Sequence, residues 1–181
     1  NYYYHNLDKR KHYSNTNNLK KNLLLIGNDI YLKGLLKFLH VVKKDYSFYL
    51  KNTNIFVVGI SNMKEFKSNI EYLNLGEIIN YKTHTNKIDD FYDNVDLFVN
   101  LSNIEGWNIS IMDAYLKKIK IFSTRVGCIN ELFKNDENIE KCCKYNVNKI
   151  NDDLKKFIIN KKNFNISHYE VLLNKLKHEE I

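Results

Sequence analysis

The sequence predicts an α/β protein built on a Rossmann-like parallel β-sheet with helices on both faces. Short apolar runs rich in β-branched residues alternate with amphipathic stretches of about ten residues, and glycine ends the first two runs. Strand–helix–strand units of this kind form parallel sheets that helices cover on both faces. Ligands of such sheets bind outside the carboxyl ends of the strands. The loops that follow the strands are therefore the candidate site.

The composition indicates one globular domain. Of 181 residues, 44% are hydrophobic and 13% aromatic, which is enough to build a core. The net charge of +7 comes from 28 Lys and Arg against 21 Asp and Glu. The lysines are scattered with acidic residues among them, which favours a solvated surface over a face that binds nucleic acid. Proline is absent and residues with AT-rich codons are over-used, so codon bias contributes to the lysine content.

Features that would indicate export are missing from the sequence. No apolar run reaches the roughly 18–20 residues that span a bilayer, and no charged-then-apolar signal segment opens the chain. Three cysteines, two of them adjacent at Cys142 and Cys143, form neither a CxxC motif nor a disulfide framework. We expect a cytoplasmic protein in a reducing compartment. Since the chain begins at Asn1 and not at Met, we also expect it to be a piece of a longer protein.

The predicted elements follow from the apolar pattern in chain order. Residues 1–20 are polar and aperiodic, and predict a flexible linker or arm ahead of a domain at 21–181. Apolar runs in the first half predict strands at 23–27, 54–59 and 77–81. Helical spacing of apolar residues there predicts helices at 33–44, 62–74 and 87–94.

The second half repeats the same alternation. Apolar runs predict strands at 96–102, 119–124 and 143–148. Between and after them, amphipathic stretches predict helices at 108–118, 129–134, 151–161 and 167–178.

The first strand-end loop, residues 26–34, combines a turn glycine with a lysine. Gly27 permits a tight turn, and Lys33 and Gly34 open the next helix. A lysine at a helix start opposes the helix dipole, and a bound anion would remove that conflict. The alternative is a surface lysine in a lysine-rich chain. The loop contains neither the GxxxxGK[ST] nor the GxGxxG phosphate-binding pattern.

The loop at 102–114 carries two acidic residues at a fixed spacing. Glu105 and Asp113 are eight residues apart, which is on the order of 12 Å along a helix. That is too far for a glycosidase pair, but it suits carboxylates that grip hydroxyl groups at two ends of an extended ligand. Asn108 or Ser110 can cap the helix, whose first amides would then face phosphates between the carboxylates. Alternatively, Glu105 is a capping-region acid and Asp113 lies on the solvated side.

Together with the loop at 123–131, these loops resemble the carboxyl-terminal domain of retaining glycosyltransferases of the GT-B fold, family 4 or "group 1". The family pattern has Glu-Gly-Phe-Gly, a second acid eight residues after the first, and a later Gly-Gly-x-Pro-Glu turn. The stretch that matches it reads SNIEGWNISIMDAYLKKIKIFSTRVGCINE. The residues that match without gaps are Ser102, Glu105, Gly106, Ala114, Thr124, Gly127 and Glu131.

The resemblance implies a role for each candidate residue. It implies that Lys33 contacts a donor diphosphate and that Glu105 binds hydroxyls of the donor sugar, so these two are the expected catalytic residues. It implies that Asp113 holds ribose hydroxyls. The implied donor-binding set is Gly27, Asn28, Lys33, Glu105, Gly106, Trp107, Asn108, Ile109 and Asp113. The residues implied to flank the base are Gly59, Tyr81 and His84. The family stabilises its leaving diphosphate without a metal, so we expect no metal and no cofactor.

Six residues depart from the family pattern, among them Cys128 in place of a second glycine and Leu101 and Asn130 in place of prolines. Asn28 stands where an Arg is usual, which removes a phosphate-binding charge. Asp113 is one methylene shorter than the usual Glu, and Asn108 replaces a glycine. These departures keep a second reading open, in which the chain is a degenerate, non-catalytic module that binds or regulates a partner subunit. A third reading, a protein driven by its +7 charge to nucleic acid or membrane, requires binding that falls steeply with salt.

The resemblance therefore implies the donor-binding domain of a retaining glycosyltransferase, of the hexosyltransferase type. Its expected substrate is a UDP- or GDP-linked sugar, and its acceptor a glycan or a lipid-linked molecule. The acceptor-binding amino-terminal domain is the missing partner, so we expect the isolated domain to be inactive. Lipid-linked acceptors also imply peripheral contact with the cytoplasmic face of a membrane. No nucleic-acid partner is expected.

Overall fold

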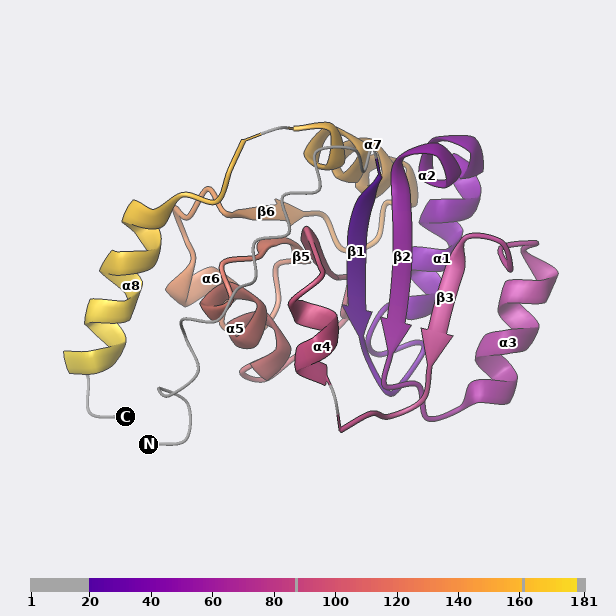
Figure 1. The fold of residues 1–181 in the computed structure, drawn as a ribbon, viewed down its shortest axis with the longest axis horizontal. Coiled ribbons are helices and arrows are strands. Elements are labelled where there is room, and N and C mark those ends of the chain that lie inside the picture. The colour runs from indigo at the N-terminus through magenta and orange to yellow at the C-terminus, as the bar shows by residue number, and fades with distance from the viewer. Residues whose placement is uncertain (1–19, 87, 161, 179–181) are drawn as a thin grey trace.

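The computed structural model describes residues 20–86, 88–160 and 162–178 (Figure 1). It contains a six-stranded, fully parallel sheet in the order β3-β2-β1-β4-β5-β6. The strands are β1 (Lys21–Ile26), β2 (Thr53–Val58), β3 (Ile79–Lys82), β4 (Leu97–Asn100), β5 (Lys120–Thr124) and β6 (Ile139–Cys142). The predicted Rossmann-like α/β fold is confirmed. The predicted arm at 1–20 lies, except for Lys20, outside the described residues.

Helices cover both faces of the sheet, as predicted. One face packs against α1 (Leu35–Lys44), α2 (Tyr46–Asn52), α3 (Met63–Tyr72) and α7 (Val147–Ile159). The other packs against α4 (Ile88–Tyr92), α5 (Ile109–Leu116), α6 (Ile129–Leu132) and α8 (Ile166–His178). Successive strand residues serve opposite cores, because side chains alternate across a strand. On β1, Leu23 and Leu25 enter the first core and Leu24 the second, all three fully buried or nearly so.

The last strand lies at Ile139–Cys142, and the predicted strand at 143–148 is wrong. The segment 143–148 is instead a turn followed by the start of α7, where the Asn146 side chain accepts a hydrogen bond from the Lys149 amide at 3.0 Å. The strand escaped prediction because it is an edge strand whose charged central residues, Glu140 and Lys141, interrupt the apolar run. Asn146 is a typical helix-capping residue, and it was the available signal.

The short helix α2 was not predicted. Its sequence, YSFYLKN, has neither helical nor strand periodicity. A long-range contact fixes it: Tyr49 is fully buried, and its hydroxyl donates to Asn151 of α7 at 3.0 Å. Tertiary packing thus decides this element over local propensity.

Candidate functional site

The loops that follow β1, β2, β4 and β5 meet at the carboxyl edge of the sheet. They lie near its centre, where β1 and β4 are neighbours, with β2 and β3 on one side and β5 and β6 on the other. Two glycines allow the loops to touch through their backbones. Gly34 has φ 68°, and a Cβ there would lie 3.0 Å from Leu101 Cβ and closer still to the Leu101 carbonyl. Gly127 has φ 57°, and its Cβ would lie 3.2 Å from Glu105 Cβ and closer still to the Gly106 carbonyl. Only glycine fits both the conformation and the space.

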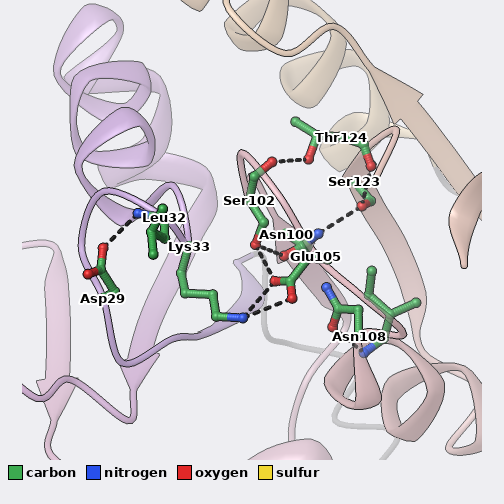
Figure 2. A network of polar contacts seen from close by, with 10 residues as sticks. Asp29, Leu32, Lys33, Asn100, Ser102, Glu105, Asn108, Ser123 and Thr124 are labelled. Carbon is green, nitrogen blue, oxygen red and sulfur yellow. Dashed lines mark hydrogen bonds and ion pairs between the residues drawn. The ribbon is translucent and has the colours of Figure 1, made fainter. Parts of the chain in front are cut away.

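This close packing brings Lys33 and Glu105 together from loops 72 residues apart in sequence. The Lys33 ammonium donates to both carboxylate oxygens of Glu105 at 2.9 Å (Figure 2). The Lys33 side chain is 32% exposed and that of Glu105 only 9%. The pair therefore sits at the mouth of the site, with its cation facing solvent and its carboxylate inside.

A chain of buried polar groups holds Glu105 from behind (Figure 2). The Ser102 hydroxyl reaches Glu105 Oε1 at 2.6 Å and Asn100 Oδ1 at 2.8 Å. Because a hydroxyl has one proton, the shorter contact to the charged oxygen takes it. Asn100 in turn donates to Ser123 at 3.1 Å, and Thr124 donates to the Ser102 carbonyl at 2.7 Å. The carboxylate is thus anchored to the ends of β4 and β5.

Hydrogen bonds also hold the loop that carries Lys33. Asp29 Oδ1 accepts from the amides of Tyr31 and Leu32 at 2.8 and 2.6 Å, which shapes the turn before Lys33. Lys37 of α1 donates to the Leu101 carbonyl at 3.0 Å and to Asn103 at 2.7 Å. Burial lowers the pKa of Lys37. These contacts fasten the loop after β1 to the loop after β4.

Asn108 begins α5 in an unusual conformation. It is left-handed, with φ 54° and ψ 75°, and its side-chain oxygen accepts from the Ile111 amide at 3.2 Å. Its amide nitrogen is buried and has no hydrogen-bond partner among the described residues. Asparagine tolerates this backbone region better than most residues. At the start of α5, the Asn108 side-chain oxygen therefore caps the helix, while its side-chain nitrogen has no acceptor among the described residues.

Asp113 lies on α5, within electrostatic reach of Asp89 on α4. Burial first, and the nearby Asp89 second, raise the pKa of this carboxyl, while Lys117 opposes the shift. Lys117 is itself drawn to α4, with ion pairs to Asp89 at 3.0 Å and to Asp93 at 3.5 Å. The charged form of Asp113 is therefore disfavoured where it stands.

The remaining predicted site residues are spread along the same edge. Gly27 is buried against Lys33, and the exposed Asn28 uses its carbonyl to accept from the Ser61 amide at 3.1 Å. Gly59, at the end of β2, lies against the backbone of Gly27. Gly106, Trp107 and Ile109 are exposed around the Glu105 loop, with Trp107 47% and Ile109 60% exposed.

The two base-flanking candidates beyond β2 differ in surroundings. Tyr81 is half-buried at the end of β3, with its ring 5.5 Å from that of Phe66. His84 is exposed in the loop after β3. Lys33 and Glu105 are thus the predicted residues whose side chains the fold brings into direct contact.

Sequence reasoning missed the polar residues that support the pair, namely Asn100, Ser123, Lys37 and Asn103. The signal was present, because Asn100 and Ser123 are polar residues at the ends of otherwise apolar runs. Buried polar side chains need partners, so two of them on neighbouring strands predict a network.

Within the described ranges, no helix is long and apolar enough to cross a membrane. Among the same residues, no group of three His, Cys, Asp or Glu side chains could hold a metal ion.

Comparison with known proteins gives a family and a set of similar folds. The family model described as "Glycosyl transferases group 1" matches residues 8–170. No curated protein matches the sequence. Among solved structures, WaaG, a glycosyltransferase involved in lipopolysaccharide biosynthesis, superposes with a TM-score of 0.75 at 16% identity, over 90% of this chain and 44% of its own.

Two further structures are similar at low identity. The C-terminal domain of a glycosyl transferase group 1 family protein (LpcC) from Francisella tularensis has a TM-score of 0.72 at 21% identity, covering 88% of this chain and 87% of its own. A variant of S. aureus TarM, solved with fondaparinux, alpha-GlcNAc-glycerol and UDP, has a TM-score of 0.72 at 20% identity, covering 87% and 33%. The chain thus spans less than half of WaaG and of TarM, and nearly all of an isolated carboxyl-terminal domain.

Proposed function

This chain belongs to the glycosyl transferases group 1 family, and from that premise we propose that it is the donor-binding domain of a retaining glycosyltransferase. Its substrate is a nucleotide-diphosphate sugar, and the acceptor is a glycan or a lipid-linked molecule held by an amino-terminal domain. The observation that carries the proposal is the Lys33–Glu105 pair, in which a cation and a nearly buried carboxylate stand side by side at the sheet edge where ligands bind.

Each group in the site has a task under this proposal. Lys33 and the first amides of α5 neutralise the diphosphate, whose negative charge grows as the sugar leaves. Glu105 accepts hydrogen bonds from sugar hydroxyls, and Asp113 from those of the ribose. Gly59, Tyr81 and His84 border the base. Fixed donors supply the electrostatic stabilisation, so we propose that transfer proceeds without a metal or a cofactor.

The UDP present in the TarM structure makes UDP the first nucleotide to test, with GDP next. Calorimetric titration of the chain with UDP, GDP and ADP should give binding of one nucleotide. Replacement of Lys33 by Ala should weaken that binding by at least about tenfold, because a charged hydrogen bond is worth about 1.5–3 kcal/mol. The matched control is Lys67→Ala, which removes an exposed lysine of α3 and should leave binding unchanged.

A second candidate, the degenerate module, is favoured by two departures from the family pattern, Asn108 at the start of α5 and, in the first loop, Asn28. Its neutral, exposed side chain leaves the first loop with Lys33 as its cation. A folded chain that binds neither the three nucleotides nor their sugar-linked forms, or one in which Lys33→Ala and Lys67→Ala behave alike, would favour this candidate and contradict donor binding.

A further inference from the structure

We propose that the Lys33–Glu105 ion pair makes this site bind the intact nucleotide sugar more tightly than the nucleoside diphosphate that remains after transfer. The inference rests on the proposed function and names a further property of the same two residues. Glu105 is then more than a ligand of the sugar, because it competes with the diphosphate for Lys33.

The competition follows from the contacts that Lys33 makes. Within the described part of the chain, its ammonium donates to Glu105 and to no other acceptor. The neighbouring Asn28 is uncharged and supplies no second cation. An anionic ligand that uses Lys33 must therefore draw the ammonium away from both oxygens of Glu105.

The loss would be costly for Glu105. Its side chain is only 9% exposed, so water cannot replace the lysine fully. Ser102 would remain on Oε1 at 2.6 Å, and Oε2 would keep no partner among the described residues. An ionised carboxylate that is nearly buried and half unpaired is strongly destabilising.

The nucleotide sugar and the nucleoside diphosphate differ in whether they give Glu105 a new hydrogen-bond donor in place of Lys33. In a nucleotide sugar, hydroxyl groups lie close to the diphosphate, so the same molecule that takes Lys33 can donate to Oε2. A nucleoside diphosphate takes Lys33 and offers nothing to Glu105. Once the sugar has been transferred, Glu105 recovers Lys33, and the nucleoside diphosphate is held less tightly.

The test is calorimetric titration of Glu105→Gln with UDP, GDP and ADP, and with UDP-glucose, GDP-mannose and ADP-glucose. Gln keeps the shape and an oxygen that accepts from Ser102, but removes the negative charge that holds Lys33. The nucleoside diphosphate that the unmodified chain binds should bind Glu105→Gln about fivefold tighter, the scale expected for a partly buried pair. The matching sugar nucleotide should gain nothing, so its advantage over the diphosphate should fall.

Two controls separate this effect from a general change of charge. Glu71→Gln removes an exposed carboxylate of α3 that pairs with Lys67, and should leave affinities unchanged. The gain should also vanish when Lys33→Gln is combined with Glu105→Gln, because no ammonium remains to be released. If Glu105→Gln does not fold, Glu105→Asp, whose shorter side chain retreats from Lys33, should change the affinities in the same direction.

The outcomes distinguish the two proposals. If the unmodified chain binds a nucleoside diphosphate and the Glu105 variant binds it equally or more weakly, the competition is refuted and donor binding stands. The same holds if Glu71→Gln gives an equal gain. If the unmodified, folded chain binds none of the six ligands, the proposed function is overturned and this inference falls with it.

Discussion

Replacing Gly34 by Ala should disrupt the contact between the loops after β1 and β4 and lower the free energy of unfolding. The left-handed backbone at φ 68° costs a residue with a Cβ about 1–2 kcal/mol. The new Cβ would also press on the Leu101 carbonyl, which accepts a hydrogen bond from Lys37 at 3.0 Å. Displacing that carbonyl forfeits a charged hydrogen bond of about 1.5–3 kcal/mol. The expected loss of unfolding free energy is therefore about 2.5–5 kcal/mol.

Urea denaturation followed by circular dichroism measures this loss, with Gly76→Ala as the matched control. No atom lies within 4 Å of a Cβ at Gly76, and its φ is not positive, so that variant should be neutral or gain up to about 1 kcal/mol. Domains of this size are stable by only about 5–15 kcal/mol, so Gly34→Ala should be visibly weakened. Should the two alanine variants unfold within about 1 kcal/mol of each other, the argument for close loop packing would be refuted.

Three further predictions concern other parts of the molecule. The folded chain raises the pKa of Asp113 above 3.8, so folding favours the protonated form and this carboxyl lowers stability as the pH rises through its folded pKa. Asp113→Asn should therefore have a higher melting temperature than the unmodified chain at pH 7, and no such advantage below about pH 3.8. Equal melting temperatures at pH 7 would contradict the raised pKa. In thiol labelling at pH 8, Cys143 should react first, because burial raises the pKa of Cys128 to about 11 and that of Cys142 to about 12. Fast labelling of all three thiols would refute this. Tyr49→Phe should lower the unfolding free energy by about 1–2 kcal/mol in urea, because the buried Asn151 loses its donor, and a change below about 0.5 kcal/mol would show that the contact contributes little.

Most of the sheet could be predicted because most of its strands are short, continuous runs of apolar residues in the sequence. β1, β2, β4 and β5 are buried on both faces, so their sequences are nearly continuous in apolar residues. β6 pairs on one side only and carries Glu140 and Lys141, so its sequence lacks that signal. α2 lacks it too, because Tyr49 is buried through a partner about 100 residues away.

The place of the candidate site at the strand ends could be predicted in part. Glycines at 27 and 34 and the acid at Glu105 marked the correct strand ends, since turns and helix starts have local signatures. The support of Glu105 by Asn100 and Ser123 could not be read in the same way. Those contacts depend on β4 and β5 being neighbours with Asn100 opposite Ser123, which no local pattern specifies.

The sequence by itself determined the class of the fold, the order of most elements and the set of residues at the strand ends. The tertiary structure decided which of those residues meet. Lys33 and Glu105 are paired because β1 lies beside β4 in parallel, with Leu24 opposite Phe98, so that their loops emerge at one edge. Periodicity acts over a few residues, whereas an ion pair across 72 residues exists only after the sheet has fixed the register of its strands.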